Sequence, residues 1–343
     1  MSNLNHLNKL CSLAVYLNDY LQSSDLSLER AKSQAGIENP FFTFREIDRM
    51  IESIRMNYLD EDKIRNWYHS FSVEFQSSEK RIGIIGAGNI PYVSFHDIWC
   101  CLAAGFRIAL KPSSKDRALI VNLVQKINEF LNHENHPIEI VETLTQFDAV
   151  ITTGGHQASQ VFKSYFEKYP SLIRGHRNSI AIISGNESED DFFNLGKDVF
   201  SYYGLGCRNV HHLLVPAGYN FDKLLDRFDL NFIYVKECNK YCNNYDYYLA
   251  SQLLSRSHFL QAESILLIES NKLNPPIACL CFSYYKDEDQ LNEMITSWMG
   301  HLQCICSNIN SLAFPVIPFG KSQYPELDSY QDNLDTISFL ANL

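Results

Sequence analysis

The sequence has no long run of basic residues, and its formal net charge at pH 7 is −11. Nucleic-acid binding depends on clustered Lys and Arg side chains that neutralise phosphates, so we expect no nucleic-acid partner. No apolar stretch reaches the roughly 18 residues that a membrane-spanning helix needs. Residues 1–6 also lack the basic and then apolar pattern of a secretory signal. These absences predict a cytoplasmic protein with no membrane span.

The sequence also lacks any Cys-x-x-Cys pair, although it contains 10 cysteines. Structural zinc sites usually combine such pairs with histidines or further cysteines at regular spacing. The close pairs Cys279-x-Cys281 and Cys304-x-Cys306 fit strands, in which alternate side chains share a face. Scattered cysteines without a secretory signal are typical of reduced intracellular thiols. We therefore predict no metal site and no disulfide framework.

Hydrophobic residues make up 45% of the 343 residues, which is enough for a large core divided among two or three domains. Residues 1–75 show apolar side chains at helical spacing, and Thr43-x-x-Glu46 is typical of a capping box that starts a helix. From Arg81 onward, short apolar runs alternate with helical stretches. This alternation predicts an α/β fold with a parallel sheet.

The predicted elements form two blocks after the helical N-terminal segment. The first block contains strands at 81–85, 107–110, 138–141 and 149–152 and helices at 91–104, 116–131 and 156–169. The second contains strands at 179–183, 213–216, 264–268, 277–284, 302–306 and 313–316 and helices at 190–203 and 287–298.

Cys207 is the first candidate for chemistry, because Gly204 and Gly206 come just before it. Glycines leave open backbone around a thiol, so a planar carbonyl substrate can approach the sulfur and a main-chain N–H together. A cysteine in the core is the alternative, since unpaired cysteine is among the most buried residue types.

A glycine cluster, Gly86-Ala87-Gly88, follows the predicted strand at 81–85. It resembles the start of a dinucleotide-binding fingerprint, but Pro91 stands where the third glycine belongs. The next strand runs into Lys111-Pro112-Ser113-Ser114, a basic and hydroxyl-bearing turn that suits a phosphate better than a ribose diol. A conventional Rossmann dehydrogenase that uses Gly86 and Gly88 stays open as an alternative.

Three motifs together resemble the aldehyde dehydrogenase superfamily. They are Asn89-Ile90-Pro91, Leu110–Ser114 and Val150–Gly155, and Cys207 follows them where that superfamily has its nucleophile. The resemblance covers about residues 80–220. The box Gly204–Asn209 and the later motif Gly320–Leu327 are most similar to the acyl-CoA reductase branch, which includes the fatty-acid reductase component of bacterial luminescence systems.

The resemblance implies an aldehyde-dehydrogenase-like fold with four parts. They are a helical segment over 1–78 packed on the cofactor domain, an NADP-binding domain over 79–177, a catalytic domain over 178–318 that carries the nucleophile, and a tail over 319–343 that returns to the cofactor domain or a subunit interface. It also implies NADPH-dependent reduction of a long-chain fatty acyl thioester to the aldehyde. The acyl donor would be acyl-CoA or an acylated partner protein, and the protein would form a homo-oligomer.

The same resemblance assigns roles to individual residues. Cys207 would be acylated, and the Asn89 side chain and the Cys207 N–H would bind the carbonyl oxygen of the tetrahedral species. Lys111, Ser113 and Ser114, with possible help from Lys115, would bind NADPH. Thr153, Gly154 and Gly155 would open a helix near His156 whose N–H groups face the pyrophosphate.

One departure from the superfamily bears on the reaction. Hydrolytic aldehyde dehydrogenases carry a glutamate before a Gly-Gly pair, whereas the corresponding stretch here, residues 172–179, contains no carboxylate. Without a positioned base, water should attack the acyl-enzyme slowly, which favours reduction over oxidation to acid. His176 in this stretch is a candidate for proton transfer, with a structural hydrogen bond as the alternative.

Simpler roles remain open for the other candidates. Asn89 could form an Asx turn before Pro91, and the lysines could belong to a solvated surface. The tyrosines of residues 241–248 are explained by core packing or by an acyl channel. For the whole chain, the alternative from another class is a catalytically idle aldehyde-dehydrogenase-like binding or scaffold protein.

Overall fold

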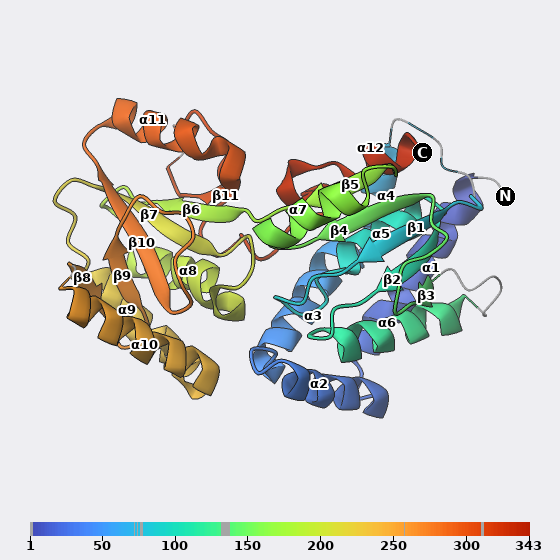
Figure 1. The fold of residues 1–343 in the computed structure, drawn as a ribbon, viewed down its shortest axis with the longest axis horizontal. Coiled ribbons are helices and arrows are strands. Elements are labelled where there is room, and N and C mark those ends of the chain that lie inside the picture. Colours follow the sequence, from blue (N-terminus) through green and yellow to red (C-terminus); the bar gives the residue numbers. More distant parts are fainter. Residues whose placement is uncertain are drawn as a thin grey trace. The chain divides into compact units, whose positions relative to one another are not determined.

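The computed structural model describes residues 3–71, 73, 75, 78–131, 138–256, 258–309 and 312–343. Residues 1, 2, 72, 74, 76 and 77 of the predicted helical segment lie outside the described residues. The chain folds into two units, Met1–His176 with Pro325–Leu343 and Arg177–Tyr324. Each unit contains its own sheet and helices, so the predicted α/β class is confirmed (Figure 1).

The first unit begins with four helices, α1 (Asn3–Gln22), α2 (Leu26–Glu38), α3 (Phe44–Tyr58) and α4 (Glu61–His69). The apolar face of α1 is buried as its spacing predicts, at Leu7, Leu10, Ala14, Leu17 and Leu21. Helix α1 therefore packs against the rest of the unit.

The capping box predicted at the start of α3 is wrong, because its side-chain hydrogen bond does not form. The helix does begin after Thr43, but among the described residues the Thr43 side chain makes no cap hydrogen bond. Glu46 is fully buried and accepts from Arg49 at 2.7 Å. The half-buried Arg49 cation competes for the carboxylate that a capping box would have turned back to the N-cap backbone.

The sheet of the first unit comprises β1 (Arg81–Ile85), β2 (Arg107–Lys111), β3 (Ile138–Ile140), β4 (Ala149–Thr153) and β5 (Ser171–Arg174). Its described strands are all parallel, in the order β3-β2-β1-β4-β5. The order reverses between β1 and β4, which in such sheets marks the position of a ligand crevice.

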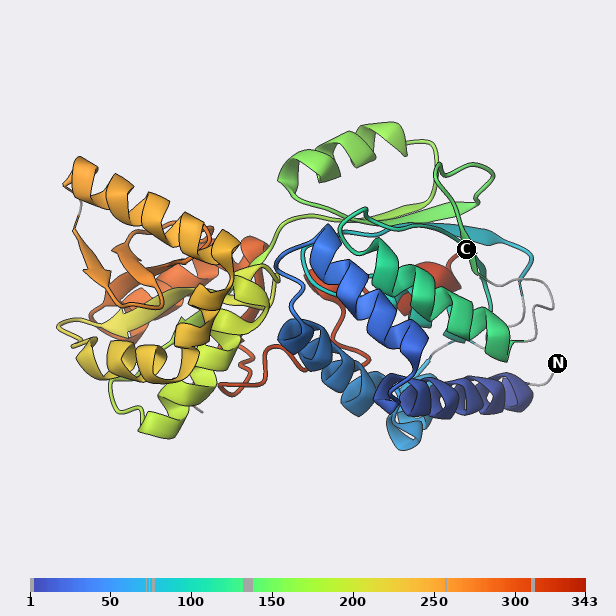
Figure 2. The same ribbon diagram turned by 90° about the horizontal axis from the view of Figure 1, so that it is seen from below.

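Helices cover both faces of this sheet. They are α5 (Phe95–Ala103), α6 (Arg117–Phe130) and α7 (His156–Tyr165), joined by α12 (Thr336–Ala341) near the C-terminus. Because crossovers between parallel strands are right-handed, a helix that leads toward one edge of the sheet and a helix that leads toward the other edge lie on opposite faces. Figure 2 shows α7 on the other side of the sheet from α6.

The second unit contains a six-stranded sheet within its described residues, in the order β11-β6-β7-β10-β9-β8. Its strands are β6 (Asn178–Ile182), β7 (Val210–Pro216), β8 (Phe259–Gln261), β9 (Leu266–Glu269), β10 (Cys279–Tyr285) and β11 (Leu302–Cys306). Only the edge pair β8–β9 is antiparallel among the described pairings. The helices are α8 (Glu189–Phe200), α9 (Asp222–Phe232), α10 (Asn239–Ser255) and α11 (Glu288–Trp298).

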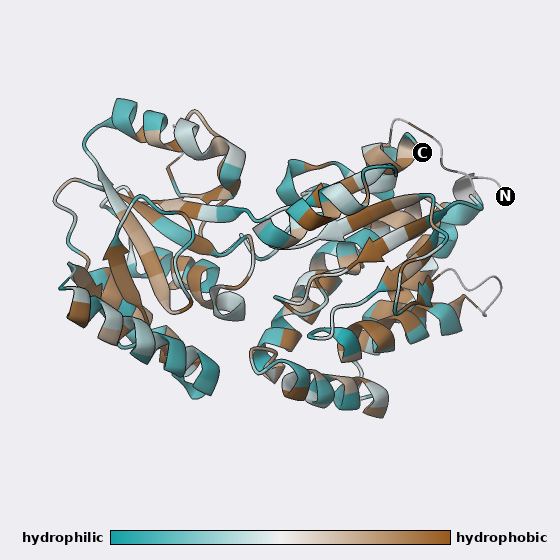
Figure 3. Ribbon diagram, in the orientation of Figure 1, coloured by the Kyte–Doolittle hydropathy of each residue, from teal (hydrophilic) through white to brown (hydrophobic). Residues whose placement is uncertain are grey.

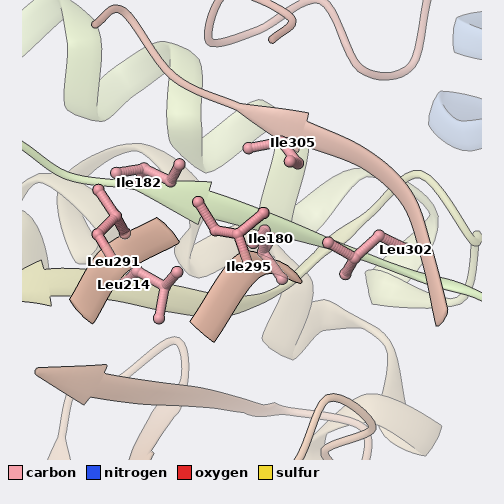
Figure 4. Packing of buried hydrophobic residues seen from close by; sticks show 7 residues of the cluster. All are labelled: Ile180, Ile182, Leu214, Leu291, Ile295, Leu302 and Ile305. Atoms are coloured by element: carbon pink, nitrogen blue, oxygen red, sulfur yellow. The ribbon is translucent and has the colours of Figure 1, made fainter. Parts of the chain in front are cut away.

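A bulge in β11 decides which side chains face the core of the second unit. The register shifts between Leu302 and Ile305, so both residues point into one cluster beneath α11 (Figure 4). The cluster consists of Ile180, Ile182, Leu214, Leu291, Ile295, Leu302 and Ile305. Figure 3 shows the apolar strands and the mostly polar outer surfaces of the helices around them.

Several predicted boundaries are corrected by local backbone geometry. The helix predicted from residue 91 begins at Phe95, because residues 91–94 form a turn in which Tyr92 has φ 52°. The helix predicted through residue 203 ends at Phe200, and the one predicted through 169 ends at Tyr165. The predicted strand at 313–316 does not form in the described residues, where Ile317 makes a single bridge to Cys306.

Some elements were not predicted from the sequence. They are β5, α9, α10, α12 and the edge strand β8. The strand predicted at 264–268 is shifted to β9, whose partner β8 comes from the preceding residues. None of the helices in the described part of the chain combines the length and the apolar character that a bilayer crossing requires.

Candidate functional site

Most candidate residues of the first unit lie at one edge of its sheet, which we call the cofactor edge after the role that the sequence predicts for it. This edge is formed by the residues that follow the carboxyl ends of β1, β2, β4 and β5. Parallel strands bring these ends together. The edge thereby collects the following candidates: Asn89 after β1; Lys111, Ser113 and Ser114 at and after β2; Thr153, Gly154 and Gly155 at and after β4; and His176 after β5.

The glycine cluster packs against protein atoms at this edge. A Cβ on Gly86 would lie 2.3 Å from Ser94 Oγ, and a Cβ on Gly88 would lie 2.4 Å from Ser113 Oγ and 2.8 Å from Lys115 Cβ. The N–H of Gly86 donates to the carbonyl oxygen of Lys111 at 3.1 Å. The two glycines therefore allow the loops after β1 and β2 to touch. A Rossmann fingerprint instead uses its glycines to admit a pyrophosphate, so this packing disfavours the conventional Rossmann alternative.

The acid nearest to the β2 turn faces inward. Asp116 is fully buried, and its Oδ1 accepts from the N–H of Tyr92 at 3.3 Å. Burial raises the pKa of Asp116 well above its ordinary value, against the opposing effect of the backbone N–H groups of Tyr92 and Val93. Lys111 and Ser114, in contrast, are exposed. The turn thus presents a cation and hydroxyls outward and no carboxylate.

The turn after β4 opens onto the N-terminus of α7. Gly155 is the N-cap residue of this helix and is exposed, and no described atom lies within 4 Å of the Cβ that it lacks. Gly154 packs against Ala158, where a Cβ would lie at 3.0 Å. The first N–H groups of a helix have no partner within the helix and favour anions. The open space before α7 fits a phosphate group.

The loop after β5 is supported by a buried ion pair. Arg174 is fully buried, and its Nη1 donates to both carboxylate oxygens of Asp97 at 2.7 Å. Burial alone would raise the pKa of Asp97, but Arg174 and His96 outweigh it and hold this pKa below its ordinary value. Arg174 also donates to Thr336 at 2.7 Å, which attaches α12 to the loop. Arg174, which belongs to the stretch 172–179 without a carboxylate, is therefore a buried cation committed to its ion pair.

A carboxylate does reach this loop from the C-terminal segment. Asp332 Oδ2 accepts from the N–H of Gly175 at 2.7 Å, and Asp332 is buried with φ 58°. Sequence reasoning missed this contact because the two residues are 157 positions apart. His176, which follows Gly175, is exposed.

Cys207 lies in the second unit, in a tight turn over Gly206–Asn209 that we call the nucleophile turn. The N–H of Asn209 donates to the carbonyl oxygen of Gly206 at 3.1 Å and closes the turn. Cys207 is half-buried, whereas Cys281 and Cys306 of the same unit are buried. The structure thus keeps the Cys207 thiol at the surface of the unit and out of its core.

Ser179 supports the nucleophile turn from β6. Its hydroxyl donates to the carbonyl oxygen of Cys207 at 2.9 Å and lies 2.9 Å from the sulfur of Cys304. A hydrogen bond with Cys306 lowers the pKa of Cys304 against the effect of burial, and the Arg208 cation adds to the lowering. Nothing in the sequence predicted this second thiol beside the turn.

A cavity of the second unit lies away from these residues. It measures about 680 Å³ and is lined in part by Ser270, Asn271 and Ser283. Next to it, His212 is fully buried and contacts Ser283 Oγ and the carbonyl oxygen of Lys272. Burial lowers the pKa of His212 to about 4. None of the predicted site residues lines this cavity.

Comparison with known proteins identifies the fold. No protein-family model matches the sequence, and no curated protein matches it. Solved structures do match, and one is aldehyde dehydrogenase 21 of Physcomitrella patens in complex with its reaction product succinate. It is 12% identical, has a TM-score of 0.65, and aligns with 98% of this chain and 84% of its own.

Two further solved structures agree. The aldehyde dehydrogenase of Bacillus cereus in its NAD+ complex is 12% identical, has a TM-score of 0.61, and aligns with 90% of this chain and 72% of its own. The aldehyde dehydrogenase KauB of Pseudomonas aeruginosa is 14% identical, has a TM-score of 0.61, and aligns with 91% of this chain and 73% of its own. This chain therefore has the fold of the aldehyde dehydrogenases, as its motifs predict.

Proposed function

We propose that this protein reduces a fatty acyl thioester to the fatty aldehyde with NADPH, through a thioester between the acyl group and Cys207. The aldehyde dehydrogenase fold and the half-buried thiol in the nucleophile turn support an acyl-enzyme. The observation that carries the choice of reduction is the loop after β5. Arg174, the fully buried last residue of β5, is paired with Asp97 in the stretch where a hydrolytic relative has its glutamate.

The first step is acyl transfer to the enzyme. The Cys207 thiolate attacks the carbonyl carbon of the thioester, and the C–S bond to the donor breaks. The departing thiolate takes up the proton that Cys207 lost. When bound, NADPH supplies the hydride that reduces the acyl carbon. The Cys207–carbon bond then breaks, which releases the aldehyde and restores the thiolate.

Both tetrahedral species carry negative charge on the former carbonyl oxygen, and hydrogen-bond donors must meet it. Asn89 is exposed at the cofactor edge, and its side-chain amide would be one of these donors. The Cys207 N–H would be the second donor.

Water would compete with hydride for the acyl-enzyme, and the stretch around Arg174, where the resemblance puts the base of hydrolytic relatives, contains no carboxylate. A base that activates water must accept a proton, which a guanidinium cannot do near pH 7. Moving Arg174 away would leave Asp97 buried without its cation. Asp332 accepts a hydrogen bond from Gly175 and is thereby engaged in holding the loop. We therefore expect the acyl-enzyme to survive until hydride arrives.

The cofactor edge would hold a dinucleotide that carries a 2′-phosphate. Lys111 and Ser114 are exposed there, and Ser113 and Lys115 belong to the same turn. A ribose diol is usually held by a carboxylate, whereas Asp116 is fully buried. Thr153, Gly154 and Gly155 would hold the pyrophosphate at the N-terminus of α7. The solved relative from Bacillus cereus is an NAD+ complex, and the exposed lysine and serine favour NADPH here.

The remaining parts of the proposal concern protons and partners. His176 is exposed beside the cofactor edge and would donate a proton to the departing group. The donor of the acyl group would be acyl-CoA or an acylated partner protein. The protein would act in the cytoplasm as a homo-oligomer.

The proposal is tested by acyl transfer without cofactor. The protein is incubated with radiolabelled long-chain acyl-CoA in the absence of NADPH, denatured, and examined for bound label. Wild type should retain label that hydroxylamine removes, and Cys207→Ala should retain none. The matched control is Cys242→Ala, another half-buried cysteine of the same unit, which should be labelled like wild type.

The outcomes separate the alternatives. Equal label on wild type and Cys207→Ala would assign the nucleophile to another residue. A complete absence of label on wild type would favour the idle binding or scaffold protein.

A further inference from the structure

We propose that Asn209 is the positioning residue of the nucleophile turn, and that Asp198 attaches the loop at residues 320–322 to the same support. This inference rests on the proposed function, because it concerns how Cys207 is held for acylation. It also provides a role for part of the Gly320–Leu327 motif.

The backbone before the nucleophile turn is held in an unfavourable conformation. Helix α8 ends at Phe200, and Tyr202, Tyr203 and Gly204 follow with φ values of 51°, 56° and 74°. Left-handed backbone is costly for the two tyrosines, which are buried. Such strain persists only where the surroundings impose it, and it is concentrated at functional sites. Some group must therefore hold this segment.

The side chain of Asn209 supplies that support. It is fully buried, and its Oδ1 accepts from the N–H of Gly206 at 2.8 Å. Its Nδ2 donates to the carbonyl oxygens of Asp198 at 3.0 Å, Val199 at 3.3 Å and Ser201 at 2.8 Å. These carbonyls belong to the end of α8, where a helix leaves its acceptors unsatisfied. One amide thus joins the helix end to the residue before Cys207.

The residue type matches this task. An amide presents an acceptor and two donors on one planar group, whereas a carboxylate presents acceptors only and a hydroxyl has a single proton. The acceptor faces an N–H and the donors face carbonyls, so an aspartate would meet three oxygens with no proton to donate. The sequence spacing, two residues after Cys207, allows the amide to reach back across the turn that its own N–H closes.

Asp198 extends the support to the C-terminal motif. Its carboxylate is fully buried and accepts from the N–H of Gly320 at 2.6 Å, the N–H of Ser322 at 3.1 Å and the hydroxyl of Ser322 at 2.7 Å. Its carbonyl oxygen accepts from Asn209. Gly320 has φ 81° and packs against Asn194, so the loop needs glycine at that position. The first residues of the motif therefore stabilise the helix end that supports the nucleophile turn.

The experiment compares two reactions of Cys207 that differ in their geometric demands. Acylation by long-chain acyl-CoA requires the sulfur and the oxyanion donors to be aligned, whereas alkylation by iodoacetamide requires only an accessible thiolate. In Asn209→Ala, acylation should slow about 10²-fold, the effect of losing one aligned oxyanion donor. Alkylation of Cys207, located by mass spectrometry, should stay within about threefold of wild type, because accessibility is retained.

Controls for folding are built into the chain. Cys281 and Cys306 are buried in the same unit and should stay unalkylated while that unit is folded. If Asn209→Ala exposes these cysteines, the milder variant Ser322→Ala tests the support instead. It removes one of the three donors to Asp198. Acylation should slow about fivefold, within the cost of one lost hydrogen bond. Asn122→Ala removes a buried amide from the first unit, which bonds to Tyr20, and should leave both rates unchanged.

Two results would overturn the role of Asn209. One is acylation of a folded Asn209→Ala at the wild-type rate, and the other is an equal loss of acylation and alkylation. Failure of wild type to become acylated at Cys207 is a different result, because it contradicts the proposed function itself.

Discussion

The nucleophile turn and the cofactor edge are built in opposite ways. Around the turn, Asn209 and Asp198 are fully buried and hydrogen-bonded to the protein. At the cofactor edge, Asn89, Lys111 and Ser114 are exposed. Hydrogen bonds within the protein hold the turn, whereas the edge presents polar side chains at the surface.

This difference separates two physical tasks. A nucleophile must be held before the substrate arrives, since misalignment by about 1 Å can cost about 10²-fold in rate. A cofactor turn must bind and release its ligand, so its side chains cannot be committed to the core. Substitutions around the turn should therefore change stability and the alignment of Cys207, whereas those at the exposed edge should change binding or rate with little change in stability.

The largest effect on stability is expected at Arg174, which is fully buried at the end of β5 and paired with Asp97. Arg174→Met leaves the Asp97 carboxylate buried without a cation, and should lower the free energy of unfolding by about 3–5 kcal/mol. Adding Asp97→Leu should recover most of this loss, because no unpaired charge then remains. Urea denaturation of the single and double variants measures both values. A loss below about 1 kcal/mol in the single variant would mean that the ion pair does not support the loop.

The next effect belongs to Asn89, on the exposed side of the comparison. Asn89→Ala should slow aldehyde formation about 10²–10³-fold through loss of an oxyanion donor. Stability should stay within about 0.5 kcal/mol, because the side chain is exposed. Single-turnover reduction and urea denaturation supply the two numbers, and Asn186→Ala, at another exposed asparagine, is the control. A stability loss without a change in rate would assign Asn89 to the turn before Pro91.

A smaller effect concerns the protonation of Asp198. Burial raises the pKa of Asp198 from 3.8 to about 6, so the folded protein binds this proton more tightly than the unfolded chain. The stabilisation is complete below the unfolded value and is lost as pH rises through about 6. From pH 5 to pH 8, wild type should lose about 1–2 kcal/mol more stability than Asp198→Asn. Equal pH profiles for the two proteins would contradict a buried, titrating Asp198.

The smallest effect should come from Ser114. A carboxylate at this exposed position repels a 2′-phosphate and accepts hydrogen bonds from a ribose diol. Ser114→Glu should therefore shift the ratio of kcat/KM for NADPH and NADH about tenfold toward NADH, equivalent to about 1.4 kcal/mol. Stability should not change. An unaltered ratio would place the 2′-phosphate away from this turn.

Local patterns were sufficient to predict the α/β class and most strands. The apolar runs at Arg81–Ile85 and Ala149–Thr153 are short and buried, as strands covered on both faces must be. The predicted helix end at residue 203 failed because left-handed Tyr202 and Tyr203 are imposed by contacts and not by local preference. Strand β5 was missed because its four residues carry a weak apolar signal.

The candidate site was predictable where a motif is continuous in sequence and not where contacts are distant. Cys207, with its glycines, was identifiable from its immediate neighbours. The pair Arg174–Asp97 joins residues 77 positions apart, and Asp198 reaches Gly320 across 122 positions. No spacing rule relates such residues, so only the folded chain reveals that they meet.

The most direct test of the account follows the fate of the acyl group on Cys207. The labelled acyl-enzyme is isolated free of acyl-CoA and divided between buffer alone and buffer with NADPH. The account predicts slow loss of label in buffer and rapid release as fatty aldehyde with NADPH. Rapid release as free fatty acid in both samples would contradict it, because water would then be activated despite the buried Arg174.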